Sequence, residues 1–417
     1  MLVLLYTAGI ACYHATIHAL APFHAKAAAW VNGRKGIWKR IEAFERGNAR
    51  LAWFHVASLG EFEQGRPLVE MIREREPGTR VVITFFSPSG HEARANYPGA
   101  DAVFYLPQES PRNARRFIRA IRPDVAIFVK YDFWYHYLHA LRDAGIPTYL
   151  LSARFRAGQL FFRRWGVLHR RMLGLFEKIL VQDDASARLL RAAGITRVDV
   201  TGDTRFDRVL DIAANARAIE RVERFRGNYP LIVCGSTWPA DEKLLLSCIR
   251  ERGETCRWVI VPHEVDEPRI RTLVARCGPA TARFSDEGID KIIDETACHV
   301  LVIDRVGLLS SVYRHATIAY IGGGFGRGIH NTLEAAVYGI PVVFGPAYRK
   351  FGEAIEMIRR GCAFPVNDDK RCNRLIDELL STPARLADAG QQARAFVQEN
   401  AGATARAFNA IKKDLPE

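Results

Sequence analysis

A candidate general base lies just after the first predicted strand of the chain. Ser58, Gly60 and Glu61 follow an apolar run at 51–56 and precede a helical pattern that continues toward Arg75. Glu61 would then lie in the first turn of a helix, where the helix dipole favours the charged carboxylate. Such a carboxylate can accept the proton of a hydroxyl. A glutamate that only caps the helix gives the same local pattern, so both interpretations stay open.

The most informative stretch holds five glycines within seven positions. It follows an apolar run at 318–321 and comprises Gly322, Gly323, Gly324, Gly326 and Gly328. Bare backbone N–H groups before a helix can bind an anion, and Arg327 adds positive charge. Asn331 and Glu334 share a face of the predicted helix, so a carboxylate there could hold a ribose diol beside a bound phosphate. The run is neither a dinucleotide fingerprint nor a P-loop, and a structural glycine turn is the alternative.

Two further apolar runs end in residues that could do chemistry. Lys130 and Asp132 follow the run at 125–129, where a lone charge is costly unless it is paired or used. A functional role and a structural ion pair are equally compatible with that pattern. Ser236 and Thr237 follow the run at 231–234, where they suit a phosphate and a plain helix cap alike.

The elements that must position these residues are those of a parallel α/β protein. Short apolar runs alternate with helical periodicity after residue 47, which predicts strands and helices in alternation. The first set of predicted strands is 51–56, 81–86, 102–106, 125–129, 148–151, 179–181 and 198–201. The second set is 231–234, 258–261, 300–303, 318–321 and 342–344. Open parallel sheets bind ligands beyond the carboxyl ends of their strands, so we expect the functional residues there.

Length and composition favour two domains. With 417 residues, 48% hydrophobic and 25% charged, the chain is not disordered, collagen-like or a polytopic membrane protein. A polar, Arg-rich helical stretch at 206–228 separates the two strand sets and is interpreted as the connection. We therefore expect a first domain at 26–210 and a second at 211–417, which includes the Ala-rich helical stretch from 383 onward. That stretch has no strand pattern, and we expect it to cover one domain or to cross back to the other.

The N-terminal segment has the pattern of a membrane anchor. Residues 1–25 contain no Asp, Glu, Lys or Arg, and five Lys or Arg follow between 26 and 40. A signal peptide carries its positive charges before the apolar stretch, whereas charges after it favour a cytoplasmic body. We interpret 1–25 as a membrane-associated helix. A soluble helix packed on the domain is the alternative, because His14 and His18 make the stretch less apolar than a confident span.

Charge also bears on the partners. The 59 Lys and Arg exceed the 46 Asp and Glu, so the net charge of +13 favours phosphorylated metabolites, acidic lipids or nucleic acid. Basic and aromatic residues interleave between 154 and 171, a pattern that fits a nucleic-acid strip or a membrane-surface strip. The apolar N-terminus favours the membrane surface, and a solvated helix face is the alternative. The eight cysteines show neither a C-x-x-C pair nor zinc-ligand spacing, and we expect reduced thiols in a cytosolic compartment.

Taken in order, these motifs resemble those of the 3-deoxy-D-manno-octulosonic acid (Kdo) transferases of Gram-negative bacteria, over nearly the whole chain. Ser58 to Glu61 is similar to the family's S-x-G-E, Lys130 to His136 to its K-T-E-L-W-P-N, and Gly322 to Glu334 to its G-G…G-x-H-N-x-L-E. The other matching stretches are Thr84 to Gly90, Ser152 to Arg154, Gly202 to Asp207, Gly235 to Thr237 and Phe344 to Pro346.

The resemblance implies a GT-B glycosyltransferase fold, with two Rossmann-like domains facing a central cleft and an N-terminal membrane-associated helix. It implies transfer of Kdo from CMP-Kdo to a lipid A precursor, lipid IVA, on the cytoplasmic side of the inner membrane. No metal, other cofactor or nucleic-acid partner is implied. By position, Glu61 would be the general base. The implied acceptor-binding residues are Ser58, Gly60, Lys130, Asp132 and Arg154. The implied CMP-binding residues are Ser236, Thr237, Pro262, His263, Gly322, Gly323, Gly324, Gly326, Gly328, His330, Asn331 and Glu334.

The sequence also departs from the family pattern. Asp132 is one methylene shorter than the family's glutamate, and the stretch after Pro262 and His263 differs from the usual P-R-H-P-E-R. A GT-B enzyme that uses a UDP-sugar on a membrane lipid is the alternative function. A non-catalytic protein that binds anionic lipid or nucleic acid is an alternative of another class.

Overall fold

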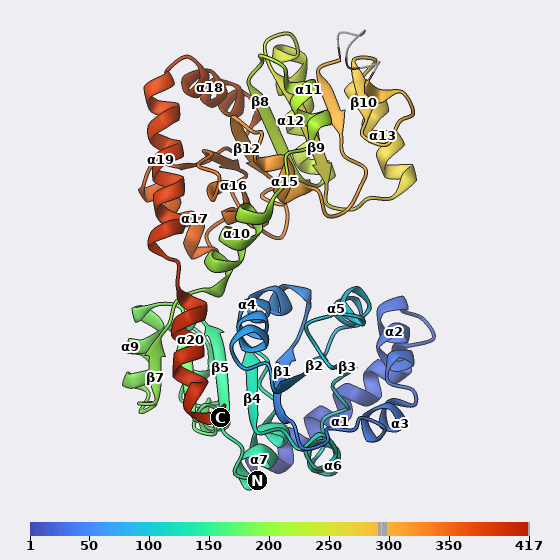
Figure 1. The fold of residues 1–417 in the computed structure, drawn as a ribbon, viewed down its shortest axis with the longest axis vertical. Helices are drawn as coiled ribbons and strands as arrows, with labels where there is room; N and C mark the ends of the chain where they lie inside the picture. Colours follow the sequence, from blue (N-terminus) through green and yellow to red (C-terminus); the bar gives the residue numbers. More distant parts are fainter. Residues whose placement is uncertain (291–292, 294–297, 416–417) are drawn as a thin grey trace. The chain divides into compact units, whose positions relative to one another are not determined.

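The computed structural model describes residues 1–290, 293 and 298–415. The chain forms two compact units (Figure 1). Unit 1 comprises Met1–Arg208 together with Ala401–Glu417, and unit 2 comprises Val209–Asn400. Each unit contains a seven-stranded parallel sheet.

The sheet of unit 1 has the strand order β3-β2-β1-β4-β5-β6-β7. Its strands are β1 (Arg50–Val56), β2 (Thr79–Phe85), β3 (Ala102–Tyr105), β4 (Val125–Val129), β5 (Thr148–Ala153), β6 (Lys178–Val181) and β7 (Val198–Val200). The helices before β4 are α1 (Leu2–Leu20), α2 (Ala25–Gly33), α3 (Ile37–Glu42), α4 (Leu59–Arg75), α5 (Pro88–Arg94) and α6 (Pro111–Ile121). The later ones are α7 (Tyr135–Asp143), η1 (Leu160–Phe162), α8 (Val167–Leu173), α9 (Asp184–Ala192), α20 (Ala403–Ile411) and η2 (Lys412–Asp414). Helix α10 (Thr204–Asn215) leads into unit 2.

The sheet of unit 2 has the order β10-β11-β9-β8-β12-β13-β14. Its strands are β8 (Leu231–Thr237), β9 (Arg257–Pro262), β10 (Thr281–Arg283), β11 (Val300–Val302), β12 (Ile318–Ile321), β13 (Val342–Phe344) and β14 (Ala363–Pro365). Its helices include α11 (Glu220–Arg226), α12 (Pro239–Arg252), α13 (Glu267–Cys277), α15 (Leu309–Tyr313), α16 (Leu333–Ala336), α17 (Gly352–Arg359), α18 (Asp369–Leu380) and α19 (Pro383–Glu399).

Apolar runs form the central strands because helices cover both faces of each sheet. In β1 every residue from Leu51 to Val56 is buried, and β4 is buried throughout. Such strands read as continuous hydrophobic segments instead of alternating ones. The strand order reverses between β1 and β4 in unit 1 and between β8 and β12 in unit 2. A doubly wound sheet binds its ligand at that switch point.

The twelve predicted strands are confirmed, with ends that differ by up to three residues. The sequence reasoning missed β10 and β14. Both are three-residue strands at the edges of the second sheet, and neither contains the apolar run by which the other strands were found.

The second domain ends earlier than predicted. It was expected to extend through residue 417, but α20 belongs to unit 1, and Figure 1 shows this red C-terminal helix among the elements of that unit. Phe408 and Ile411 of α20 are buried in a core shared with α4. Asp207 accepts hydrogen bonds from Gly402 N at 2.5 Å and from Thr404 N and Oγ1 at 2.6 Å each. Helical periodicity identifies an apolar face, but it does not say which sheet the face will cover.

The N-terminal segment forms α1, which is apolar and long enough to be a candidate membrane helix, with a mean hydropathy of 1.3. Most of its surface is exposed, including Leu2, Leu4 and Leu5. Its other side contacts unit 1, where the Tyr6 hydroxyl donates to Glu109 Oε2 at 2.6 Å.

Candidate active site

The predicted base lies at the switch point of unit 1. Ser58 is the N-cap residue of α4, directly after β1, and Glu61 lies in the first turn of that helix. The Ser58 hydroxyl donates a hydrogen bond to Glu61 Oε2. Glu61 remains partly exposed, so its carboxylate is oriented by the chain and still accessible. The packing at position 60 does not require a glycine, because a Cβ there would meet only Ser58 Oγ at 3.7 Å.

Lys130 follows β4, the strand beside β1. Its φ of 60° lies in the left-handed region, and its N–H donates to Leu151 O at 2.9 Å. Its ammonium attracts the carboxylate of Asp203 electrostatically. Asp203 is buried and accepts hydrogen bonds from the Arg205 guanidinium at 2.7 and 2.9 Å. Burial alone would raise the pKa of Asp203, but Arg205, with a further contribution from Lys130, holds that pKa below its usual range. The strand end therefore carries a fixed, mostly paired set of charges.

Asp132 ends a buried polar chain that sequence reasoning did not find. The His55 ring is fully buried on β1, with Nε2 2.6 Å from Asp132 Oδ2 and Nδ1 2.8 Å from Thr84 Oγ1. Thr84 accepts from Trp53 Nε1 at 2.9 Å. The Thr84 hydroxyl can therefore donate its own proton to His55 Nδ1. His55 then carries its proton on Nε2, which donates to Asp132. Trp134 Nε1 reaches the same Nε2 at 3.2 Å, but the shorter bond to a carboxylate decides the tautomer.

This chain answers the question that the sequence left open for Asp132. Asp132 has a structural partner, His55, while its side chain keeps 16% of its surface exposed. It can therefore be held in place and still contact a ligand. A histidine inside an otherwise apolar strand was the available signal, because a buried polar ring needs partners.

Arg154, after β5, joins the same group through its backbone. Its carbonyl accepts from the Tyr131 hydroxyl at 2.6 Å, and its guanidinium donates to Asp183 at 3.1 Å. Thus the predicted acceptor residues of unit 1 follow three adjacent strands, β1, β4 and β5. Their loops are linked by His55 and Tyr131.

In unit 2 the glycine run is folded tightly onto its neighbours. A Cβ on Gly322 would lie 2.2 Å from Ser236 O, and one on Gly324 would lie 2.5 Å from Gly345 N. These two glycines therefore allow the loop to pass between the ends of β8 and β13. Ser236 itself has a φ of 54°, in the left-handed region.

The backbone of this run is less bare than expected, because four of its five glycine N–H groups donate within the chain. The N–H groups of Gly322, Gly323, Gly326, Gly328 and His330 all donate within the chain. Gly323 N bonds to the buried Asp241 at 2.8 Å, and the other four bond to backbone oxygens. Close packing of backbone on backbone consumes these donors, which a sequence pattern cannot show.

The helix after the run is also shorter than expected. Helix α16 has four residues, and Asn331 lies two positions before it. Asn331 and Glu334 do meet, because Asn331 Nδ2 donates to Glu334 Oε1 at 2.9 Å. The Asn331 amide and the Glu334 carboxylate therefore lie side by side as a hydrogen-bonded pair.

Three aromatic rings stack beside the glycine run, and one of them was not predicted. Ring centroids of Trp238 and His263 are 4.7 Å apart, and those of His263 and His330 are 4.4 Å apart. Trp238 Nε1 donates to His330 Nε2 at 3.0 Å. Burial lowers the pKa of His330 to about 4 and also lowers that of His263, so both rings are neutral near pH 7. Trp238, His330 and three glycines of the run, Gly323, Gly326 and Gly328, line a cavity of about 720 Å³.

Trp238 is the functional candidate that sequence reasoning missed in unit 2. It follows Ser236 and Thr237 directly, at the end of β8, and an aromatic ring after a central strand was the signal. The Arg269 guanidinium lies over its ring, 5.5 Å from the centroid, and helps to hold it in place. Pro262 and Thr237 contribute backbone here, since His263 N donates to Thr237 O at 3.0 Å.

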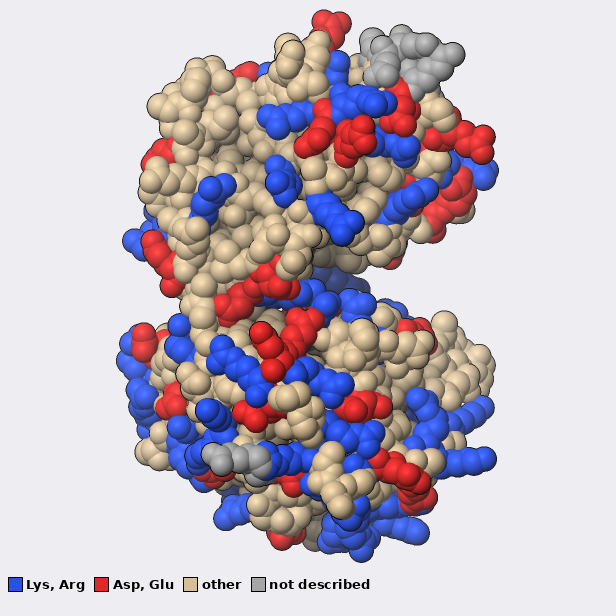
Figure 2. All heavy atoms as spheres, in the orientation of Figure 1, with Lys and Arg blue, Asp and Glu red and all other residues tan. Residues whose placement is uncertain are grey.

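The net charge of the chain lies in one unit. Unit 1 contains 34 Lys and Arg against 21 Asp and Glu, whereas unit 2 contains 25 of each. Lys and Arg spheres cover much of the face of unit 1 that Figure 2 shows. Unit 1 is therefore the unit with electrostatic attraction for anionic partners.

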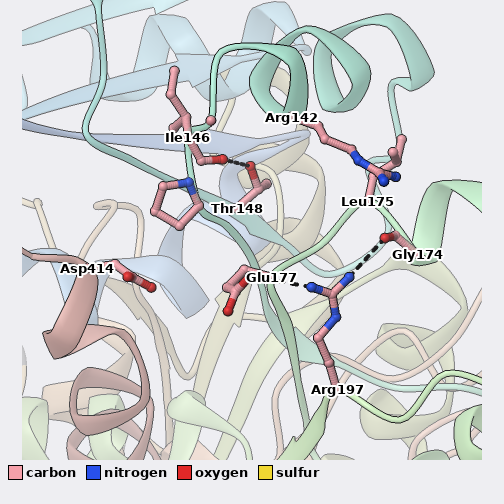
Figure 3. Close-up of a pocket in the computed structure, with 10 residues that line it drawn as sticks. Arg142, Ile146, Thr148, Gly174, Leu175, Glu177, Arg197 and Asp414 are labelled. Atoms are coloured by element: carbon pink, nitrogen blue, oxygen red, sulfur yellow. Dashed lines mark hydrogen bonds and ion pairs between the residues drawn. The ribbon is translucent and has the colours of Figure 1, made fainter.

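A different hollow of unit 1 lies away from the motifs. It has a volume of about 390 Å³. Figure 3 shows Thr148, Glu177, Arg197 and Asp414 among the residues that line it. Thr148 and Glu177 are at the amino ends of β5 and β6. The Arg197 guanidinium donates hydrogen bonds to Glu177 and to Gly174 O, so it is already paired within the protein. We assign this hollow no part in the site.

Comparisons with known proteins agree with the motif pattern. A family model described as 3-deoxy-D-manno-octulosonic-acid transferase (kdotransferase) matches residues 33–208. The 3-deoxy-D-manno-octulosonic acid transferase of Bordetella pertussis is 30% identical over 380 residues, covering 86% of each chain. That of Aquifex aeolicus is 25% identical over 336 residues, covering 79% of this chain and 86% of its own.

Solved structures bear on the fold alone. A putative UDP-N-acetylglucosamine 2-epimerase from Listeria monocytogenes superposes with a TM-score of 0.60 at 16% identity, covering 89% of this chain and 99% of its own. A glycosyltransferase from Rickettsia africae gives 0.58 at 13% identity, covering 89% and 100%. These likenesses, together with the two sheets, confirm the predicted fold class of two Rossmann-like units of the GT-B type.

Proposed function

The chain belongs to the 3-deoxy-D-manno-octulosonic acid (Kdo) transferase family, and from this we propose that it transfers Kdo from CMP-Kdo to a lipid A precursor. It is a glycosyltransferase. The observation that carries the assignment of the reacting group is the position of Glu61. This carboxylate is oriented by Ser58, partly exposed, and located at the switch point of the basic unit.

In the proposed reaction, Glu61 accepts the proton of a sugar hydroxyl of the acceptor. The hydroxyl oxygen then forms a bond to the anomeric carbon of Kdo, and the bond from that carbon to the phosphate oxygen of CMP breaks. CMP leaves with the electron pair. Lys130, Asp132 and Arg154 would bind the acceptor, and Ser58 and Gly60 would complete its site beside the base.

Unit 2 would bind the CMP part of the donor. We assign the ring system of Trp238, His263 and His330 to the nucleobase, since neutral aromatic rings offer a stacking surface. Ser236, Thr237, Pro262 and the glycine run would enclose the phosphate and ribose. The Asn331–Glu334 pair would hold the ribose hydroxyls, because a carboxylate and an amide oxygen accept hydrogen bonds from a diol.

We further propose that α1 lies along the cytoplasmic surface of the inner membrane. Tyr6 and Thr7 near its start and His18 near its end all hydrogen-bond to unit 1, with partners Glu109, His136 and Gln108. A helix crossing the bilayer needs about 20 residues free of such polar partners. Contacts over most of the 19 residues of α1, with leucines exposed on it, favour an interfacial helix.

The test is an assay of the purified full-length protein in detergent. CMP-Kdo is generated in situ, the acceptor is a tetra-acylated disaccharide bisphosphate, and the product is identified by mass. We expect one or more added Kdo units for the wild type. We expect Glu61→Gln to lower turnover by about 10²–10⁴, the usual contribution of a general base. CMP binding, measured by calorimetry, should be retained.

Glu74→Gln is the matched control, because Glu74 lies on the same helix and is exposed. Equal activity of Glu61→Gln and Glu74→Gln would refute the assigned base. Product formation only with a UDP-sugar would support the alternative donor. We propose that no metal is needed, and loss of turnover on adding EDTA would contradict that point.

A further inference from the structure

A second cavity of unit 1 opens beside Asp132. It has a volume of about 700 Å³ and is lined by the loop after β4, by η1, by α8 and by α1. Its wall is mainly apolar, with Tyr6, Phe133, Trp134, Phe161 and Met172, and Asp132 is its carboxylate. The cavity therefore adjoins the proposed acceptor site.

Packing of aromatic rings keeps this cavity formed. Phe133 and Phe161 meet edge to face with centroids 5.1 Å apart, and Phe133 also meets Phe176 at 6.0 Å. Phe161 is itself held by Phe155 at 5.5 Å. Rings in such contact resist collapse of the space between them.

The apolar helix α1 supplies one wall. Tyr6 faces the cavity, and the neighbouring residues Leu4 and Leu5 of the same helix are 74% and 63% exposed. Exposed leucines on an interfacial helix mark the side of a lipid surface. The same helix therefore lines the cavity and carries the surface that we propose contacts the membrane.

The rim of the cavity is formed by the lining residues Leu160 and Arg163, and Trp165 lies two residues further along the chain. Leu160 and Trp165 are 47% and 70% exposed, and the Arg163 guanidinium lies 5.8 Å from the Trp165 ring centroid. Tryptophan and arginine side by side suit the boundary between lipid headgroups and acyl chains. Unit 1, which holds this rim, also carries the whole net charge of the chain.

We propose that this cavity binds one acyl chain of the lipid acceptor, with the sugar of the acceptor at Asp132. This inference rests on the proposed function. It adds that the enzyme recognises the acceptor by one of its acyl chains. An amphiphile fits because the carboxylate of Asp132 meets hydroxyl groups, the aromatic wall meets methylenes, and the arginines near the rim meet phosphate.

The experiment compares acceptors that share one phosphorylated sugar headgroup and differ in acyl length, each kept monomeric with lipid and detergent below their critical micelle concentrations, so that the chain moves from water into the cavity. Each methylene that enters the cavity should lower the acceptor KM by up to about fourfold. The KM for CMP-Kdo should not follow chain length, because donor binding is assigned to unit 2.

Gly158→Phe is designed to fill the cavity mouth. Gly158 lines the cavity, a Cβ there meets nothing within 4 Å, and its φ is not in the left-handed region. Gly78→Phe is the matched control, since a Cβ at Gly78 is equally unobstructed and that residue is not part of the cavity wall. We expect Gly158→Phe to reduce the KM ratio between short-chain and long-chain acceptors toward one. Gly78→Phe should keep the wild-type ratio.

Failure of this inference and failure of the proposed function give different results. If the wild type transfers Kdo equally well to short and long acceptors, or if Gly158→Phe keeps the full chain-length ratio, the acyl site is refuted and the function stands. If the wild type adds no Kdo to any acceptor, the function itself fails. In that case, a lipid with a brominated chain still tests the cavity, because the part of the tryptophan quenching that is lost in Trp134→Phe reports on this site. If that part is unchanged in a Gly158→Phe background, the inference is overturned.

Discussion

Removal of the His55 ring is the sharpest test of the buried polar chain behind Asp132. His55 is fully buried and bonds to Asp132 at 2.6 Å and to Thr84 at 2.8 Å. We expect His55→Ala to destabilise unit 1, and also to release Asp132 from its fixed orientation.

The size of the effect follows from the bonds that are lost. A hydrogen bond to a charged group is worth about 1.5–3 kcal/mol, and a neutral one about 1 kcal/mol. The deleted ring also leaves a space among Trp53, Phe128 and Trp134 side chains, which adds a packing cost. Asp132 keeps some access to water, which limits the penalty for the unpaired carboxylate. Together these terms predict a loss of about 3–5 kcal/mol in the free energy of unfolding.

His55→Gln should recover part of this loss, because an amide N–H can still donate to Asp132. Thr84→Val removes the other end of the chain and should cost about 1–2 kcal/mol by itself. A double-mutant cycle of His55→Ala and Thr84→Val should give a coupling of about 1 kcal/mol, in the range found for residues in contact.

The assays are urea unfolding followed by tryptophan fluorescence, and steady-state kinetics with the lipid acceptor. If Asp132 binds the acceptor, His55→Ala should raise the acceptor KM about tenfold, while His55→Gln restores most of it and the CMP-Kdo KM stays unchanged. A loss below about 1 kcal/mol in His55→Ala, or a coupling near zero, would refute the argument.

Two further outcomes follow from two carboxylates of unit 1, Asp207 and Glu109. Asp207→Ala removes three hydrogen bonds to the first turn of α20 and should lower the free energy of unfolding by about 2–4 kcal/mol and expose residues 401–415 to proteolysis. The exposed Asp388→Ala is the control, and equal proteolysis of both variants would contradict the anchoring role. Burial raises the pKa of Glu109 from 4.5 to about 7, so the unfolded chain releases this proton first as pH rises. The stabilisation is then complete below pH 4.5 and is lost between pH 4.5 and 7, by up to about 3 kcal/mol. Glu109→Gln should remove that part of the pH dependence in urea unfolding, and parallel curves for wild type and variant would rule it out.

The sequence by itself determined the fold class and the end of each strand at which the candidate residues lie. Continuous apolar runs such as 125–129, in alternation with helical periodicity, are typical of strands covered on both faces. The residues that follow such strands lie at the carboxyl edge of the sheet. This is why Ser58, Glu61, Lys130 and Ser236 could be named before the structure, in their order along the chain. The two edge strands β10 and β14 were missed because neither contains an apolar run, whereas equally short strands such as β13 do.

Only the tertiary structure decided which side chains meet. The chain from Trp53 through Thr84 and His55 to Asp132 joins residues up to 79 positions apart, and the stack of Trp238, His263 and His330 joins three separate loops. Likewise α20 packs on unit 1 although it follows unit 2 in sequence. Local pattern reports how a segment buries its own apolar face. The pairing of distant segments instead depends on how all faces of both sheets are filled at once, and that solution exists only in the folded chain.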